Sequence, residues 1–380
     1  MKPARILVLF GNVPLYGNER ANIETLSALQ HAGAEVLFLI RSYWTKETIQ
    51  PELARQGLRF VEVPYFESVR RGVSPAIWLR NIVGVMSGSF RLLRLLRTTK
   101  ATHIHVGSTA WVLNFIPALL ITRVPLILRA GDVPPQHHLL WRLVWKYARR
   151  RAAVIVCDSY FVRDELVALG ADPKKCDVIY APAPARETVP RLRSHKATAQ
   201  LTVLYVGQIT ESKGVDVLVR VATRLIQEYP VKFVIAGDYS GRNSFGQALV
   251  NRVAQSGLKE VIRFTGFVGD IEGLYSDADL HVVPSVWKEP YGLTVLESKQ
   301  RGVASVVFPM GGLRETVEHG VDGWVCSAAT ETELERALRH YFEHPELCDT
   351  QGKAAYLSLT CRLKVHEYST RWTQVYDAVQ

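Results

Sequence analysis

Two glutamates lie eight residues apart on either side of a glycine, in the segment Glu289-Pro-Tyr-Gly-Leu-Thr-Val-Leu-Glu297. The apolar run LHVVPS precedes this segment and an apolar stretch continues it, which predicts a buried strand, a glycine turn and a helix. Because open α/β sheets bind ligands beyond the carboxyl ends of their strands, the turn is a candidate ligand site. Gly292 would let backbone N–H groups approach a pyrophosphate at the start of the helix. Glu297, about one turn inside, could accept hydrogen bonds from ribose hydroxyls, while Glu289 could face a sugar.

The same spacing also fits a simpler arrangement, in which one glutamate caps a helix and the other is a solvated surface residue. A second segment, LTVLYVGQITESKGVDVLVRVA, predicts a strand, a short loop and a helix that starts at Lys213 and Gly214. A lysine there can meet a phosphate as a point charge, although a lysine near a helix start is more often only solvated. The loop lacks the GxxxxGK[ST] spacing of a Walker loop.

Asp277 and Asp279 form a DxD pair, a pattern that could suggest a metal-bound nucleotide sugar. The pair directly precedes a predicted buried strand instead of following one. Aspartates at such a position more often end a helix, so we expect both to be structural. The sequence therefore predicts no metal site.

Short runs rich in Val, Ile and Leu alternate with longer amphipathic stretches along both halves of the chain. This alternation predicts parallel strands joined by helices, and a proline-containing break over residues 181–200 separates two such series. We therefore predict an α/β protein with two doubly wound, Rossmann-like domains, residues 1–182 and 183–364. Residues 365–379 carry apolar side chains at helical spacing and predict a closing helix.

The composition of the 380-residue chain, 48% hydrophobic and 22% charged, fits a globular protein and excludes a disordered, collagen-like or coiled-coil one. Five scattered cysteines without a CxxC clip indicate reduced intracellular thiols. The N-terminal apolar run is too short for a signal peptide, and the longest apolar stretch, residues 111–121, is too short to span a bilayer. We expect a cytoplasmic protein.

Positive charge is concentrated in the first half of the chain. The net charge is +10, residues 1–196 hold 28 basic and 14 acidic residues, and residues 68–131 contain no Asp or Glu. Within this acid-free stretch, residues 73–100 combine arginines with apolar side chains such as Phe90, Leu92 and Leu96, which suits a helix in the headgroup region of an anionic membrane. Alternatively, the apolar residues pack on the first-domain sheet and the arginines are a solvated face. No RNA-binding signature accompanies the charge, so we expect no nucleic-acid partner.

Four segments, in this order along the chain, carry a resemblance to a known family. VGQITESKGVDVLV, FTGFVGDIEGLYSDADLHVVPS, EPYGLTVLES and GGLRETVEHGVDGWV together resemble the family 4 retaining glycosyltransferases of GT-B fold. They cover most of the second domain. The first domain is similar more loosely, through its opening strand, the stretch NERANIETLSALQHAGAEV after a glycine loop, and a run ending in CDSYFVRDELVALG.

The resemblance implies that the two domains face each other across a cleft, with a nucleotide sugar held mainly by the second. The closing helix, in residues 365–380, would cross back to the first domain. Transfer would proceed with retention and without an essential metal or other cofactor. By position, Glu297 matches the glutamate that binds the ribose, Glu289 the one that touches the donor sugar, and Lys213 the lysine that neutralises the leaving diphosphate.

Two further segments match donor-binding parts of the family. Phe267 and Val268 resemble the segment beside the nucleobase, and the turn over the phosphates is matched by Gly292, Leu293 and Thr294. Gln208 stands where the family usually has an arginine, so the phosphate pocket would be one charge short. A cation of the first domain, Arg129 or Arg20, could supply that charge.

The first domain departs from the family in two places. Only the second of its usual paired N-terminal glycines is kept, as Gly17, and Gly131 stands where the family has a histidine near the donor sugar. The possible substitutes for that histidine are Asp132, His137 and His138. Both histidines also fit a plain role at the start of a helix.

The predicted function is that of a retaining glycosyltransferase that uses a nucleotide-diphosphate sugar, with a UDP or GDP sugar favoured as the donor. The predicted acceptor is lipid-linked or a polysaccharide, and the predicted role is the assembly of cell-envelope polysaccharide or glycolipid at the inner face of the cytoplasmic membrane. Two other classes stay open: a GT-B-shaped nucleotide-sugar epimerase, and a degenerate protein that binds nucleotide sugars without transferring them. Gln208 and Gly131 favour degeneracy, whereas Glu289, Lys213 and Glu297 argue against it.

Overall fold

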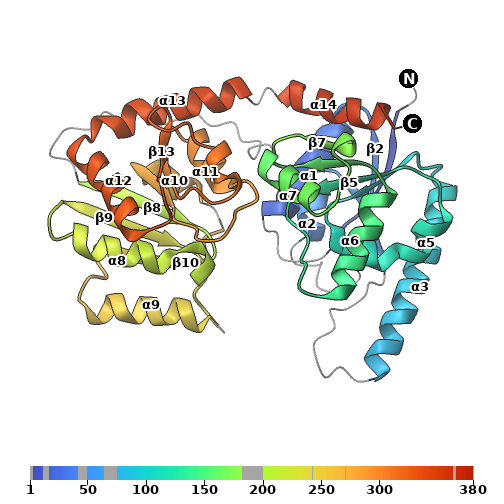
Figure 1. Cartoon of the computed structure of the whole chain (residues 1–380), viewed down its shortest axis with the longest axis horizontal. Helices are drawn as coiled ribbons and strands as arrows, with labels where there is room; N and C mark the ends of the chain where they lie inside the picture. The colour runs from blue at the N-terminus through green and yellow to red at the C-terminus, as the bar shows by residue number, and fades with distance from the viewer. Residues whose placement is uncertain are drawn as a thin grey trace. The chain divides into compact units, whose positions relative to one another are not determined.

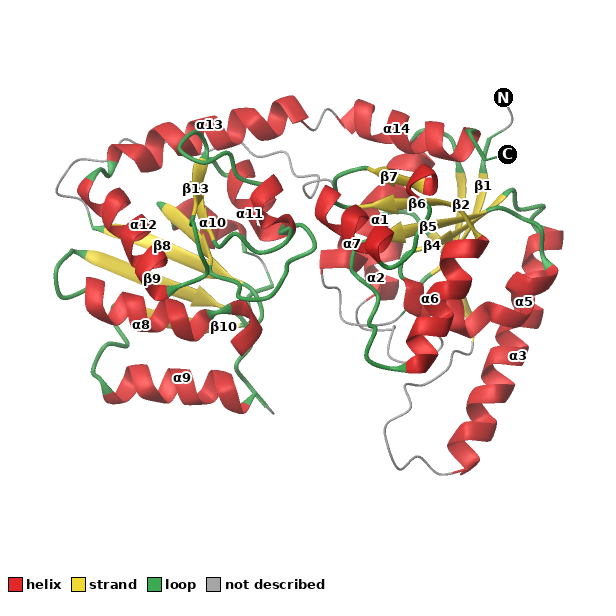
Figure 2. Ribbon diagram, viewed as in Figure 1, coloured by secondary structure: helices red, strands yellow, loops and turns green. Residues whose placement is uncertain are grey.

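The structure is a computed structural model that describes residues 3–11, 17–41, 49–63, 75–181, 200–241, 243–269, 271–362 and 365–379. The chain forms two compact units, which are named here unit 1 (Met1–Pro184 with Val365–Gln380) and unit 2 (Ala185–Lys364). Each unit contains one parallel sheet with helices on both faces, as Figure 2 shows. The prediction of two Rossmann-like folds is therefore confirmed.

Unit 1 contains a seven-stranded sheet in the order β3-β2-β1-β4-β5-β6-β7, with every neighbouring pair parallel. The strands are rich in Val, Ile and Leu and most of their residues are buried, as expected for a sheet that is covered on both faces. They are β1 (Arg5–Leu9), β2 (Glu35–Arg41), β3 (Arg59–Val63), β4 (His103–Val106), β5 (Leu126–Ala130), β6 (Ala152–Cys157) and β7 (Cys176–Val178).

The helices of unit 1 cover the two faces of this sheet (Figure 1). One face packs against α1 (Gly17–His31), α2 (Ile49–Arg55) and α14 (Val365–Asp377). The other packs against α3 (Pro75–Thr98), α5 (Ile116–Ile121) and α6 (Leu139–Arg151), together with α4 (Thr109–Val112) and α7 (Tyr160–Ala168).

The closing helix α14 is part of the core of unit 1, although the whole of unit 2 separates it from the rest of unit 1 in sequence. Trp372 is completely buried, and Tyr376 OH lies 2.7 Å from Nδ1 of His105 on β4. The hydroxyl of Tyr368 hydrogen-bonds Thr25 on α1. These contacts confirm the prediction that the C-terminal helix returns to the first domain.

Unit 2 contains a six-stranded parallel sheet in the order β10-β9-β8-β11-β12-β13. Its strands are β8 (Leu201–Val206), β9 (Val231–Ala236), β10 (Ile262–Gly266), β11 (Leu280–Val283), β12 (Ala304–Val307) and β13 (Gly323–Val325). Its helices are α8 (Val215–Leu225), α9 (Ser244–Gln255), α10 (Glu272–Asp277), α11 (Leu293–Gln300), α12 (Glu331–Glu343) and α13 (Glu346–Arg362). One face of this sheet packs against α8, α9 and α12, whereas α10 and α11 lie on the other face.

A buried polar stack fixes α11 on the sheet of unit 2. Nδ1 of His281 on β11 lies 3.0 Å from Oγ of Ser305 on β12, and this hydroxyl lies 2.7 Å from Oγ of Ser298 on α11. At the next residue, Lys299 Nζ donates to a carboxylate oxygen of Asp322 at 2.5 Å, with both side chains buried. Burial lowers the pKa of His281 to about 3, so the stack contains a neutral imidazole.

We expect unit 2 to lose stability on acidification because His281 stays neutral in the folded state, while the unfolded chain takes up a proton below a pKa of about 6.5. The stability from the neutral imidazole is complete above that pKa and is lost as the pH falls toward 3. At pH 5 the loss is about 2 kcal/mol. Urea unfolding at pH 7 and pH 5 measures it.

The matched variants for this test are His281→Asn, which should remove the contribution of His281 to the difference for unit 2, and His344→Asn. The side chain of His344 is 53% exposed, so its replacement should leave the pH dependence in place. The same pH dependence in His281→Asn as in the unchanged protein would contradict the assignment.

Candidate functional site

The candidate site is built on two neighbouring parallel strands of unit 2. β8 and β11 pair in the same direction, so the segments that follow them, 207–213 and 284–292, leave the sheet at the same edge. Lys213 lies in the first segment and Glu289 in the second, and their side chains meet with Nζ 2.6 Å from Oε1. The pairing of the strands thus joins two residues that are 76 positions apart in the sequence.

The Lys213–Glu289 ion pair is sheltered on the carboxylate side and open on the lysine side. The side chain of Glu289 is 11% exposed and that of Lys213 is 29% exposed. Ser285 donates its hydroxyl hydrogen to Oε1 of Glu289 at 2.7 Å, and the backbone N–H of Gly312 donates to the Glu289 carbonyl at 2.7 Å. The carboxylate is therefore held in place, while the ammonium group remains accessible to a ligand.

Backbone contacts hold the two loops together beside this pair. The carbonyl of Ser212 accepts hydrogen bonds from the N–H groups of Val286 and Trp287, at 3.0 and 3.1 Å. Gly214 follows with φ +66°, a conformation that side chains rarely adopt, and a Cβ there would lie 1.9 Å from the carbonyl oxygen of Pro284. Glycine is therefore required at this position, because the chain must turn into α8 against the neighbouring loop.

The turn before α11 is also set by a glycine. Gly292 precedes the helix with φ +101°, and a Cβ there would lie 2.5 Å from Cδ2 of Leu313. Leu293 and Thr294, the first two residues of the helix, are partly exposed. The first N–H groups of a helix have no partner within it and attract anions. The start of α11 thus follows a glycine turn, and phosphate binding there stays a prediction.

Glu297 lies one turn into α11 and is partly exposed. The hydroxyl of Tyr275 lies 3.1 Å from Oε2 of Glu297 and 3.1 Å from the carbonyl oxygen of Thr294. Burial is the main cause that raises the pKa of Tyr275, so its hydroxyl keeps its proton and can donate. Sequence reasoning missed Tyr275; it precedes β11 on α10, and nothing in its spacing links it to Glu297.

The remaining predicted residues of unit 2 surround this edge of the sheet. Phe267 directly follows β10 and is 77% exposed, which leaves its ring free to stack on a flat ligand, and Val268 beside it is half-buried. Gln208 directly follows Gly207 at the end of β8 and is exposed; its carbonyl accepts a hydrogen bond from Tyr205 OH at 2.7 Å. The Gln208 side chain therefore faces solvent without a positive charge.

Asp277 and Asp279 lie away from this edge. Asp277 is the last residue of α10, and Oδ2 of Asp279 accepts a hydrogen bond from the N–H of Thr202 at 2.6 Å, at the amino end of β8. Among the described residues, the structure contains no group of three or more His, Cys, Asp and Glu side chains that could hold a metal ion.

Gly17 and Asp132 belong to unit 1, where Gly17 is the first residue of α1 and Asp132 is exposed just after β5. Oδ1 of Asp132 accepts a hydrogen bond from the N–H of Val133 at 2.7 Å. His138 precedes α6 as its N-cap residue, and its ring lies 4.4 Å from that of His137. Both histidines are exposed at a helix start.

A side chain at position 131 would require the Asn18 side chain to move. A Cβ at Gly131 would lie 2.3 Å from Oδ1 of Asn18 and 3.0 Å from Oδ2 of Asp158. Asp158 in turn pairs with Arg129 at 2.7 Å, and the Arg129 side chain is completely buried. The suggestion that Arg129 supplies the charge missing at Gln208 is therefore wrong, because this guanidinium is enclosed within unit 1. Arg20 is exposed on α1.

Two models of known protein families match the chain. The model of "Glycosyl transferases group 1" matches residues 191–358, and that of "Glycosyltransferase Family 4" matches residues 17–184. The chain belongs to these glycosyltransferases. The match to the second model is consistent with the loose similarity found in the first domain, and the match to the first covers every segment that carries the candidate site.

Curated relatives of this chain align with it over part of their length. An uncharacterised glycosyltransferase of Methanocaldococcus jannaschii is 38% identical over 126 residues, which are 32% of this chain and 31% of the relative. The glycogen synthase of Mycobacterium tuberculosis is 30% identical over 189 residues, 48% of this chain and 44% of the relative. The chain thus spans less than half the length of these relatives.

Solved structures resemble the family member over its whole length. HepE of Anabaena, crystallised with UDP and glucose, superposes with a TM-score of 0.78 at 18% identity and covers 99% of this chain and 100% of its own. Sucrose-phosphate synthase of Thermosynechococcus elongatus gives a TM-score of 0.78 at 16% identity and covers 99% of both chains. These likenesses establish the GT-B fold.

We expect Gly214→Ala to destabilise unit 2 much more than Gly241→Ala. Both glycines have a left-handed backbone, with φ of +66° and +65°, but a Cβ at Gly241 would have no neighbour within 4 Å. Each substitution should cost about 1 kcal/mol for the backbone conformation, and Gly214→Ala about 2 kcal/mol more for the contact with Pro284. Chemical unfolding of both variants measures the difference; equal losses would show that the two loops do not approach as described.

Proposed function

We propose that the chain is a retaining glycosyltransferase that moves a sugar from a nucleotide-diphosphate sugar to an acceptor hydroxyl. The observation that supports this most strongly is the Lys213–Glu289 ion pair at the carboxyl edge of the unit 2 sheet, beside the start of α11. A held carboxylate, an accessible ammonium group and free helix N–H groups suit a ligand that has sugar hydroxyls next to a diphosphate.

The leaving diphosphate gains negative charge as the bond to the sugar breaks, so its stabilisation is the main task of the site. Lys213 and the first N–H groups of α11 supply positive charge there. Glu297, with its position set by Tyr275, binds the ribose hydroxyls, and Phe267 lies beside the nucleobase. UDP in complexes of the similarly folded HepE supports a UDP sugar as donor.

Retention follows from attack on the face that the diphosphate leaves. The acceptor oxygen bonds to the anomeric carbon as the bond from that carbon to the phosphate oxygen breaks, its electron pair stays on the diphosphate, and the hydroxyl proton passes to the departing phosphate oxygen. This route needs no protein nucleophile. Glu289 suits the role of positioning a sugar hydroxyl better than that of a nucleophile, because Lys213 and Ser285 already share one of its oxygens. We propose that no metal ion takes part.

Incubation of the purified protein with a panel of nucleotide sugars in EDTA, with and without a lipid-linked acceptor, tests this function. Release of the nucleotide diphosphate with formation of an axially linked product from an axially linked donor supports it. An isomerised nucleotide sugar would show an epimerase, and binding without turnover a degenerate family member. Activity that appears only after manganese is added would contradict the metal-independent mechanism.

We expect Glu297→Ala and Glu289→Ala to affect different kinetic constants. Glu297→Ala removes the ribose contact and should raise the KM for the donor about tenfold, with a smaller effect on kcat. Glu289→Ala should lower kcat about a hundredfold, because it changes the contact to the sugar that is transferred. Initial rates at varied donor concentration separate the two, and unchanged kinetics in both variants would remove the site assignment.

We propose that the acceptor is lipid-linked and that unit 1 meets an anionic membrane at the cytoplasmic face, as part of envelope polysaccharide or glycolipid assembly. The support is the part of α3 over residues 79–90, where large apolar side chains face outward. Small and polar side chains face the protein there, among them Asn81 and Ser89, which are buried. The outward stripe repeats at helical spacing and consists of Leu79, Ile82, Val83, Met86 and Phe90, each more than half exposed.

Exposed apolar side chains also lie on two other helices of unit 1. Leu120 and Ile121 on α5, which packs against α3, are 68% and 67% exposed, and Leu139 on α6 is 69% exposed. Leu92 and Leu96, expected in the headgroup region, are instead buried against the sheet, so the outward surface ends near Phe90 and exposed arginines follow it. Apolar residues next to cations favour an anionic lipid surface. Within the described ranges, no helix is both long and apolar enough to cross a bilayer.

Sedimentation with liposomes tests the membrane proposal. Binding should require anionic lipid, weaken at high salt, and fall at least threefold when Arg91, Arg94 and Arg97 are changed together to glutamine. The matched control changes three exposed cations of unit 2, Arg252, Lys259 and Arg263, to glutamine and should bind as the unchanged protein does. Protein that stays in the supernatant with anionic vesicles at low salt would contradict the proposal.

A further inference from the structure

A second pocket lies in unit 1 at the amino ends of its strands, the sheet edge opposite to the one where ligands of this fold bind. Its volume is about 390 Å³, within the range of small-molecule sites. The first residues of β1, β2 and β3, which are Arg5, Glu35 and Arg59, line it together with the end of α3. The pocket is thus separate from the donor site of unit 2 and from the carboxyl edge of its own sheet.

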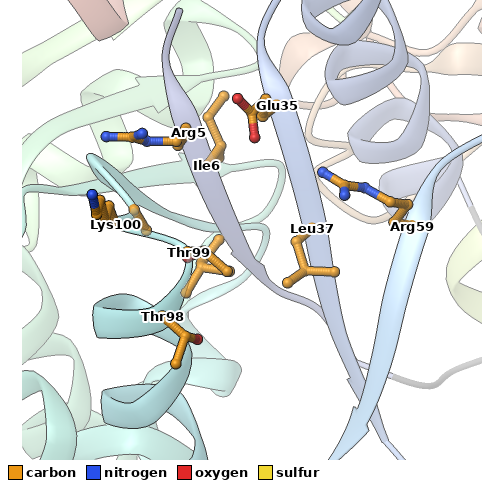
Figure 3. Close-up of a pocket in the computed structure, with 10 residues that line it drawn as sticks. Arg5, Ile6, Glu35, Leu37, Arg59, Thr98, Thr99 and Lys100 are labelled. Atoms are coloured by element: carbon orange, nitrogen blue, oxygen red, sulfur yellow. The ribbon is translucent and has the colours of Figure 1, made fainter.

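Strand pairing gathers charge around this pocket. Arg5 pairs in register with Glu35, and Arg59 with Leu37, so neighbouring strands present their side chains side by side. Figure 3 shows Arg5 and Lys100 on one side of the pocket and Arg59 on the other, with Glu35 and Leu37 between them. Three cations and one carboxylate give a net charge of +2, which complements a phosphate group.

The cations of the pocket are available to a ligand. Arg5, Arg59 and Lys100 form no ion pair with any residue that the structure describes. Nε of Arg5 is buried and has no hydrogen-bond partner among the same residues, which leaves a polar atom unsatisfied. The two threonine hydroxyls at the end of α3 both donate to the Leu95 carbonyl, so the cations are the groups left to bind an anion.

We propose that this pocket binds a phosphate ester that carries hydroxyl groups. Arg5 and Lys100 hold the phosphate, and Glu35 accepts hydrogen bonds from the hydroxyls of the ligand, while Leu37 contacts its carbon skeleton. The chemistry is shared by a free polyol phosphate and by a glycerol phosphate headgroup of a lipid. The proposal does not depend on glycosyl transfer, because the pocket lies in the other unit and at the opposite edge.

Lys100 provides a test that separates binding from folding. It lies two residues after the end of α3 with φ +49°, a left-handed conformation in which glycine is more stable than lysine. The N–H of Ala101 donates to the Leu96 carbonyl across this turn, as in helix ends that usually carry glycine. Lys100→Gly should therefore fold with an unchanged or higher Tm while removing one cation of the pocket.

Isothermal titration with glycerol 3-phosphate provides the first measurement. The unchanged protein should bind it, and Arg5→Gln and Lys100→Gly should each raise the Kd about tenfold or more. Arg123→Gln, which removes an exposed cation elsewhere in unit 1, should leave the Kd within about twofold. Because the donor site is in unit 2, binding that survives both pocket substitutions would come from another site and would overturn the proposal.

Sedimentation with vesicles of phosphatidylglycerol distinguishes the source of the phosphate ester. If Arg5→Gln and Lys100→Gly lose glycerol 3-phosphate but still bind vesicles, the ligand is a free metabolite. If they lose vesicle binding, the pocket holds a lipid headgroup. An unchanged protein that binds neither probe, or variants that bind both as the unchanged protein does, would contradict the assignment of this pocket.

Discussion

The ion pair between Lys213 and Glu289 depends on one constraint, the parallel pairing of β8 and β11. Because both strands end at the same edge, a lysine and a glutamate that are far apart in sequence meet at 2.6 Å. In the unliganded protein the carboxylate neutralises the ammonium group. A diphosphate that enters beside α11 would compete for Lys213 and leave Glu289 free to accept a sugar hydroxyl, so one pair of side chains can serve both parts of the donor.

Buried polar groups hold this edge in place. The stack of His281, Ser305 and Ser298 holds α11 on the sheet, and the buried Lys299–Asp322 pair holds the same helix at the next residue. All five side chains are buried. They keep the start of α11 and Glu297 in register with the loops, and such positioning is worth more to a site than any single added contact.

Much of the fold could be predicted from the sequence, because strand periodicity is a local pattern. The spacing around Gly292 and the family resemblance indicated candidate site residues, and the roles of these residues stay predictions. Contacts across the sheet could not be predicted from local patterns. Tyr275 contacts Glu297 only because α10 and α11 fold together. Arg129 is not available to a ligand because it forms a buried ion pair with Asp158, which directly follows the neighbouring strand β6. The crowding of position 131 likewise depends on the side chain of Asn18, which is far away in the sequence.

Two surfaces of unit 1 also could not be located from the sequence alone. The sequence of α3 is amphipathic, but which face is buried depends on the sheet. Small and polar residues are buried as far as Ser89, and Leu92 and Leu96 are buried after it. The cations of the amino-edge pocket come from two separate strand starts, Arg5 and Arg59, and from Lys100 after α3, and no local motif joins them. A charge excess is visible in composition, whereas its placement is a property of the fold.

The most direct test of the central claim is UDP binding by titration calorimetry to the unchanged protein, Lys213→Gln and Glu289→Gln. The account predicts that Lys213→Gln weakens UDP binding about tenfold or more, because it removes the cation that meets the diphosphate. Glu289→Gln should bind UDP more tightly, since the competing carboxylate is gone while the sugar it would contact is absent. UDP binding that is unchanged in Lys213→Gln, or weakened equally in both variants, would contradict the claim that the diphosphate and Glu289 share this lysine.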